Sequence, residues 1–232
     1  MMELIHMTAT YSNALLVAIL PHVSDFAKKL DLPILQPITV EQVQEFRPSP
    51  VKDFIGGGLM LTNGFWFAFN NGYVNSFRSP DNVFYDQDPA VNWPKYAYGK
   101  SNMTTNDAIT LARDALLKLG YKPELLGCAI PPKSVTGPHD TKDGHHVPHC
   151  QIRWERYPEP QTAEEQASND VVTVEINMEK KTVTGLSVIS KKLWKSPPKV
   201  GVEPELERDF QKRNKLGSMF VRSNAPPSVP NK

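Results

Sequence analysis

Cysteine is scarce in this chain, with only Cys128 and Cys150 among 232 residues. Two cysteines cannot build the disulfide framework of a small secreted domain, although they can form one bridge. Such a bridge would close a loop of about twenty residues, and the chain-entropy model assigns it roughly 3 kcal/mol. We nevertheless expect two free thiols. The apparent start of the chain carries no export signal, and a Cys150 on a buried strand face need not lie within disulfide distance of Cys128.

Long apolar runs and an excess of one charge are also missing. No stretch reaches the roughly 18 apolar residues of a membrane span, and the first 23 residues lack the basic region and cleavage site of a signal peptide. Lys and Arg number 26 against 25 Asp and Glu, a net charge of +1. We therefore expect no nucleic-acid partner and no membrane span. The compartment is left open: cytoplasmic by default, or periplasmic or secreted if the true start lies upstream.

Short catalytic motifs are absent as well. The sequence contains no G-x-S-x-G, P-loop, dinucleotide fingerprint or H-E-x-x-H motif. These are local patterns that indicate common enzyme chemistries. This absence favours a protein that is not an enzyme and that carries no cofactor.

Two segments have the apolar periodicity of amphipathic helices. The first is residues 12–30, which contains Pro21, and the second is residues 105–119. Thr104 and Asp107 have capping-box spacing at the start of the second helix, and Gly120 stands at its end. The apolar stripes comprise Leu15, Leu16, Ile19, Val23, Phe26, Ala27 and Leu30 in the first segment, and Ala108, Leu111, Ala112, Ala115, Leu116 and Leu119 in the second.

Each predicted helix is followed by short runs typical of β-strands. The stretch "GGGLMLTNGFWFAFNNGYVNSFRSP" contains Asn63-Gly64 and Asn71-Gly72, and Asn-Gly between apolar runs is a strong signal for a tight hairpin turn. The runs "VPHCQIRWERY", "DVVTVEINM" and "KTVTGLSVIS" predict a second meander after the second helix. The chain therefore reads as helix, meander, helix, meander.

This order predicts an α+β protein of two similar modules, each a helix packed on an antiparallel meander. The predicted modules are residues 1–80 and 104–195, joined by an ordered linker at 81–103 and followed by a polar helix and disordered tail at 196–232. The helix ends "DFAKKLDLP" and "DALLKLGYKP" share a pattern of Asp, Lys-Leu and Pro, which together with the element order favours an internal duplication.

The segment "NDAITLARDALLKLGY", the strand ending "QIRWERY" and the hairpin "DVVTVEINMEKKTVTGLSVIS" together resemble a PepSY module over residues 104–192. Gly185 stands where that family has a glycine, while the long loop between Cys128 and His146 departs from its pattern. The resemblance implies a helix on a curled antiparallel sheet, similar to cystatin-like folds. It also implies an inhibitory, propeptide-associated or ligand-binding role.

The residues "DGHHVPHC" at 143–150 concentrate the side chains that bind zinc. A metal-dependent hydrolase using the loop 138–149, with ligands from His139, Asp143, His145 and His146, is therefore the alternative function. Strand alternation opposes a larger site, because His145 and His149 would lie roughly 13 Å apart. Alternation also places Cys150 on the face opposite His149, which disfavours a cysteine nucleophile activated by that histidine. We expect no metal.

The same alternation predicts candidate binding residues. His149, Gln151, Arg153 and Glu155 form a polar row facing away from the second helix, with a solvated surface as the simplest interpretation. Trp66 lies between Phe65 and Phe67 and is expected on the outer side of its strand, away from the core. The sequence therefore favours a binding or inhibitory module that recognises a peptide or protein segment on an exposed sheet surface or edge.

Overall fold

The computed structural model describes residues 9–51, 54–70, 73–82, 99–142, 144–157, 159–190 and 193. All of them belong to one compact unit, residues 1–198. Most of the predicted linker, residues 83–98, and the predicted helix and tail at 196–232 lie outside the described residues.

The first helix, α1 (Ala9–Lys29), contains Pro21 and the predicted stripe except Leu30, which lies one residue beyond its end. The side chains of Leu15, Ile19, Val23 and Ala27 are completely buried, and they recur at steps of four. Burial of this stripe is what holds the helix on the protein, because an apolar side chain gains about 25 cal/mol per Å² removed from water.

Four antiparallel strands follow α1 and the 3₁₀ turn η1 (Val40–Gln42). The Asn63-Gly64 hairpin is present, with Gly64 at φ +85°, and it joins the second strand to the third. The sequence did not predict the first strand, which carries Pro48 and Pro50, residues that cannot donate backbone hydrogen bonds. The strands are β1 (Val43–Val51), β2 (Phe54–Leu61), β3 (Trp66–Asn70) and β4 (Tyr73–Arg78).

The second helix, α3 (Thr105–Lys118), begins and ends as its sequence predicts. The Thr104 side chain accepts from the Asp107 amide at 3.2 Å, and the Asp107 carboxylate accepts from the Thr104 amide at 3.0 Å. This reciprocal pair satisfies two backbone donors that the first turn of a helix leaves open. Beyond the last turn, Gly120 takes φ +81°, a conformation that favours glycine.

The predicted second meander is also present, as the last three strands that the structure describes. The sequence did not predict the short strands and the small helix around it. The strands are β5 (Ser134–Thr136), β6 (His139–Asp140), β7 (His146–Val147), β8 (His149–Glu155), β9 (Val171–Asn177) and β10 (Thr182–Ile189), and the helix is α4 (Ala163–Ala167).

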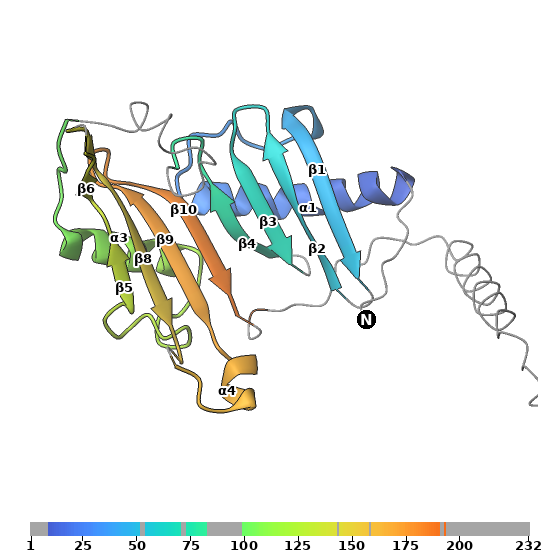
Figure 1. Ribbon diagram of the computed structural model, residues 1–232. Helices are drawn as coiled ribbons and strands as arrows, with labels where there is room; N and C mark the ends of the chain where they lie inside the picture. The colour runs from blue at the N-terminus through green and yellow to red at the C-terminus, as the bar shows by residue number, and fades with distance from the viewer. Residues whose placement is uncertain are drawn as a thin grey trace, which may run out of the picture. The chain divides into compact units, whose positions relative to one another are not determined.

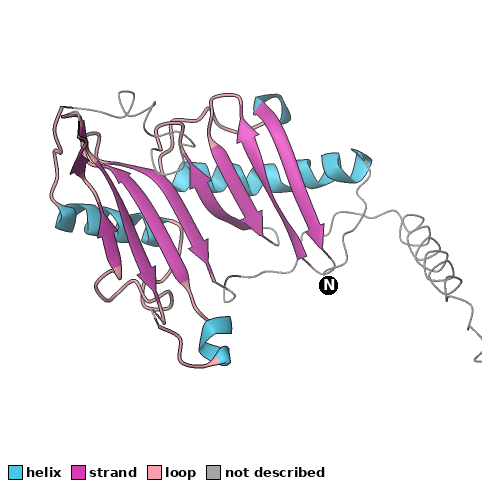
Figure 2. Cartoon of the chain, in the orientation of Figure 1, coloured by secondary structure: helices cyan, strands magenta, loops and turns pink. Residues whose placement is uncertain are grey.

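Strands from both halves of the chain join one eight-stranded antiparallel sheet, in the order β1-β2-β3-β4-β10-β9-β8-β5. The junction is the pairing of β4 with β10, in which Arg78 lies opposite Gly185. Both long helices cover the same face, α1 behind β1 to β4 and α3 behind β8 to β10 (Figure 1). Figure 2 shows the strands of the sheet in one colour, with the long helices behind them. The architecture is therefore α+β with a large antiparallel sheet.

Aromatic packing fills the interface between α1 and the sheet. Phe26 of α1 packs edge-on against Phe67 and Phe77, with 6.1 Å and 5.7 Å between the ring centroids. Both of these strand residues are fully buried. Each such pair contributes about 0.5–1.5 kcal/mol to stability beyond what the buried apolar area contributes. Among the described residues, no helix is long and apolar enough to cross a membrane.

Candidate functional site

By strand alternation the five predicted binding residues leave the same face of the sheet, opposite the two long helices, although His149 and Glu155 are buried there. Cys150, Ile152 and Trp154 of β8 are buried in the core, and the alternate residues of the same strand point the other way. We call this second surface the polar face. Its central residues are Trp66, Ala68, Ser76, Arg78, Gln151, Arg153, Thr173 and Ser187.

Strand register connects Trp66 with Gln151 in a single row across the sheet. Each residue of this row is the direct partner of the next, so all their side chains leave the same face. Four strand steps of about 4.8 Å separate Trp66 from Gln151, roughly 19 Å in all. The row reads Glu45, Met60, Trp66, Arg78, Gly185, Glu175, Gln151 and Thr136.

The neighbouring row has small side chains at its centre and an arginine near each end. Arg47 bonds Glu45 two residues away on β1, and Arg153 Nε donates to Glu155 Oε1 two residues away on β8 at 2.7 Å. Between them the side chains are short, because glycine, alanine, serine and threonine carry few atoms, and we call this stretch the low strip. Ser76 and Thr173 within it are buried. This second row reads Arg47, Gly58, Ala68, Ser76, Ser187, Thr173, Arg153 and Ser134.

Trp66 borders this low strip on one side. Its indole ring lies over Gly58, where a Cβ atom would come within 3.0–3.2 Å of the ring. The Arg78 guanidinium lies over the same ring at 4.1 Å from its centroid, a cation–π contact worth about 0.5–1 kcal/mol at a partly exposed position. Trp66 is therefore held flat against the sheet, with part of its surface accessible.

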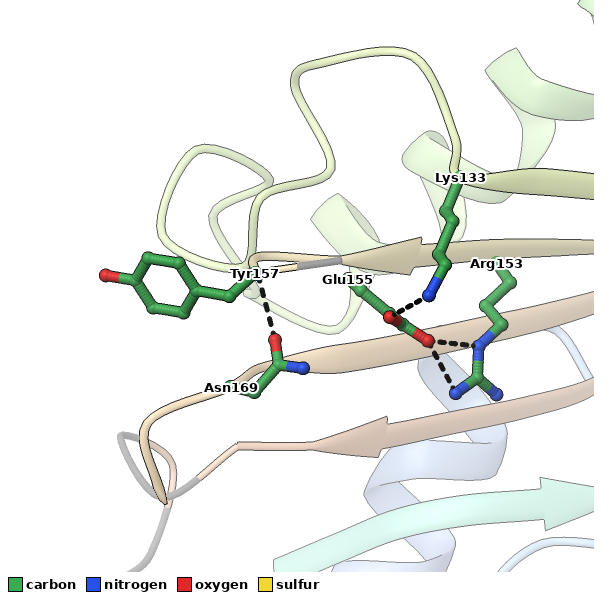
Figure 3. A network of polar contacts seen from close by, with 5 residues as sticks. All are labelled: Lys133, Arg153, Glu155, Tyr157 and Asn169. Carbon is green, nitrogen blue, oxygen red and sulfur yellow. Dashed lines mark hydrogen bonds and ion pairs between the residues drawn. The ribbon is translucent and has the colours of Figure 1, made fainter. Parts of the chain in front are cut away.

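Glu155 forms the centre of a charged cluster at the other end of the strip (Figure 3). Its side chain is 8% exposed, Lys133 Nζ lies 2.5 Å from Oε2, and Arg153 donates twice to Oε1 at 2.7 Å. The hydrogen bond from Lys133 is the largest cause that lowers the pKa of Glu155. Nearby, the Tyr157 amide donates to Asn169 Oδ1 at 2.9 Å. The carboxylate is thus ionised and fixed.

His149 does not lie on a solvated surface as the sequence predicted. Its side chain is completely buried, with Nε2 3.4 Å from Asn177 Nδ2. Burial lowers the pKa of His149 to about 4; the charge of Asp81 opposes this, while Lys180 adds to it. The imidazole is therefore neutral at pH 7 and belongs to the interior, leaving Gln151 and Arg153 as the accessible members of its predicted row.

The loop that the alternative function uses forms the small hairpin β6–β7. Of the four predicted metal ligands, His139, His145 and His146 are described, and Asp143 lies outside the described residues. Among the residues that the structure describes, no three His, Cys, Asp or Glu side chains come together as a metal site.

His146 instead takes part in a contact that the sequence did not predict. Its Nδ1 lies 2.7 Å from Asp140 Oδ1, and its Nε2 lies 3.1 Å from Ser101 Oγ. Ser101 is 45 positions away in a segment without periodicity, so no local pattern could have pointed to it. We call these three residues the Ser101 cluster.

Both cysteines are free and buried, as predicted. Burial raises the pKa of each thiol to about 12, although the Arg113 charge opposes the shift at Cys128. A nucleophilic cysteine needs the opposite shift, because the thiolate is the reactive species. Cys128 and Cys150 therefore behave as small apolar residues of the core.

Comparison with known proteins gives no relative, since no family model, curated protein or solved structure matches the chain.

Proposed function

We propose that the polar face is a binding surface and that the protein acts chiefly as a binding or inhibitory module rather than as an enzyme. The bound partner is a peptide or protein segment laid across the low strip from Trp66 to Arg153. The observation that carries this proposal is the register row of small side chains between an aromatic ring and a charged cluster. An extended segment can lie close to the sheet only where side chains are short.

The strip offers suitable chemistry for a peptide. The half-buried Ser187 supplies a hydroxyl group that both donates and accepts hydrogen bonds, while Ser76 and Thr173 beside it are buried. Trp66 offers a flat apolar surface, and aromatic rings of this kind are favoured anchors in interfaces. The polar face thus combines groups that bond a peptide backbone with one anchor for a side chain.

The two edges of the sheet are less suitable for strand addition. β1 carries Pro48 and Pro50, and proline on an edge strand removes the donors that a docking strand needs. β5, at the other edge, has three residues. These features favour recognition on the face over recognition at an edge.

The two halves of the chain support a duplicated origin for this surface. In each half a helix precedes a set of antiparallel strands, and the last strand of each half, β4 and β10, pair with one another. We infer two related modules, the second of them PepSY-like, with the strip running across both. Binding of an inhibitory or ligand type is what the PepSY resemblance implies.

Selection from a displayed library of random peptides tests the proposal. The wild-type protein should enrich peptides whose binding is lost in Ala68→Arg and in Ser187→Arg, because the long side chain fills the strip. Leu117→Arg, at an exposed position of α3, is the matched control and should bind as wild type does. Failure to enrich any peptide, or equal binding by all variants with unchanged unfolding temperatures, would overturn it.

A further inference from the structure

The geometry of the Ser101 cluster matches the roles of a nucleophile, a base and an orienting group. In such a group the nucleophile and base lie within about 2.6–3.2 Å, and a third group fixes the base. The distances of 3.1 Å from Ser101 Oγ to His146 Nε2, and of 2.7 Å from His146 Nδ1 to Asp140 Oδ1, satisfy both conditions. A triad is recognised by this geometry and not by sequence position.

The base and its orienting group are held together by the β6–β7 hairpin. Asp140 and His146 are direct partners across the two strands. The turn beyond them is fixed by Thr141, whose Oγ1 accepts from the His145 amide at 3.0 Å and whose amide donates to the His145 carbonyl at 2.8 Å. The contact between Asp140 and His146 thus follows from backbone pairing.

The nucleophile is held against the same end of the sheet by its neighbour Asn102. The Asn102 amide donates to the Met178 carbonyl, and its side chain donates to the Glu179 carbonyl, both at 3.0 Å. Met178 in turn donates its amide to the Pro148 carbonyl at 2.6 Å, directly after β7. A continuous set of backbone hydrogen bonds therefore connects Ser101 with the hairpin that carries its base.

The hydrogen bonds also set the tautomer of the imidazole. An ionised carboxylate only accepts, so Nδ1 of His146 must donate to Asp140. A neutral imidazole then has its lone pair on Nε2, facing the Ser101 hydroxyl. That is the form of the ring that removes a proton from serine. His146 is 30% exposed and Ser101 is half-buried, so a small molecule can reach both.

We propose that Ser101 is a nucleophile that cleaves small carboxylic esters, with His146 as general base and acid and Asp140 as a positioning residue. The site shares no residue with the strip on the polar face, and this proposal does not rest on the proposed binding function. Esters are favoured over amides because the alkoxide that departs needs less assistance from an acid than an amine does.

Two steps complete the reaction. Ser101 Oγ bonds to the carbonyl carbon while its proton moves to His146 Nε2; the bond to the alkoxide then breaks, and His146 returns the proton to the departing alcohol. Water attacks the acyl group on Ser101, gives a proton to His146, and releases the carboxylic acid as Ser101 recovers that proton. No oxidant or reductant is required.

Labelling by a fluorescent fluorophosphonate tests the nucleophile directly, since serine displaces fluoride and keeps the phosphonyl group. We expect one label, located on Ser101 by peptide mass spectrometry and absent in Ser101→Ala. Ser168→Ala, which changes an exposed serine outside the cluster, should label as wild type does. His146→Gln should slow the labelling by about a hundredfold, the lower range for loss of a general base. Absence of a label on wild type, or equal labelling of Ser101→Ala, would overturn the proposal.

Two further variants test the positioning role of Asp140. Asp140→Ala should slow both the labelling and the hydrolysis of p-nitrophenyl acetate, and Asp140→Glu should restore most of the rate. A purely structural role would instead lower the unfolding temperature without rescue by glutamate. If Asp140→Ala reacted as fast as wild type, Asp140 would have no part in the site. Ser101→Ala should bind peptides on the polar face as wild type does. The esterase proposal and the binding proposal can therefore fail independently of one another.

Discussion

Glu175 lies directly opposite Gly185 on adjacent strands, and its carboxylate occupies the space next to the Cα atom of that glycine. A Cβ atom at Gly185 would come within 2.3 Å of Glu175 Oε2 and within 2.3 Å of Asn82 Nδ2. The Asn82 side chain is fixed by its hydrogen bond to the Thr184 carbonyl at 3.1 Å, and the Gln151 amide donates to Glu175 Oε1 at 3.2 Å. The glycine is therefore required by close packing and not by its backbone angles.

Gly185→Ala should lower the free energy of unfolding by about 2 kcal/mol, because both neighbouring groups are buried and hydrogen-bonded and must move. Urea denaturation followed by circular dichroism measures the change. Gly99→Ala is the control, since its Cβ would have one ordinary contact, 3.8 Å from Glu179 Oε1, and should change stability by less than about 0.5 kcal/mol. Equal stability of the two variants would contradict the packing argument.

The protein should lose stability as the pH falls from about 6.5 toward 4, because His149 is neutral in the folded state. In the unfolded chain His149 takes up a proton near its ordinary pKa, whereas in the fold its pKa is about 4. The unfolded state thus binds more protons in this interval, which costs the fold roughly 3 kcal/mol at the lower end.

Urea denaturation between pH 7 and pH 5 measures this slope, above the range in which most carboxylates titrate. His149→Gln should flatten it, since glutamine does not ionise, whatever its effect on stability at pH 7. The charges around His149 include Asp81, which favours the protonated ring, and Lys180 and His139, which disfavour it. A slope that is the same in the variant would rule out His149 as its cause.

Alkylation without reductant should add two labels to the denatured protein, one each at Cys128 and Cys150. In the folded protein the reaction should be slow, because both thiols are buried and the pKa of each is about 12. Intact mass spectrometry at successive times counts the labels. A denatured protein that takes no label would show a disulfide, and would make an oxidising compartment the better interpretation.

Much of the local structure follows from the sequence alone. The Thr104 and Asp107 cap, the Gly120 stop and the apolar period fix α3, and the Asn63-Gly64 turn fixes a hairpin, because each depends on residues only a few positions apart. Alternation along β8 likewise assigns Cys150 to the core and Gln151 and Arg153 to the other face. These features made the α+β class and part of the candidate binding face predictable.

The rest was decided by contacts between distant segments. β1 forms despite Pro48 and Pro50 because β2 pairs with it, and no local signal states that β4 lies beside β10 or that Trp66 shares a row with Gln151. The burial of His149 and the contact between Ser101 and His146 likewise depend on segments that are far apart in the sequence. Sequence periodicity specifies which face a side chain takes within its own element, whereas strand register and loop placement depend on which arrangement of the whole chain satisfies backbone hydrogen bonds and buries the apolar faces together.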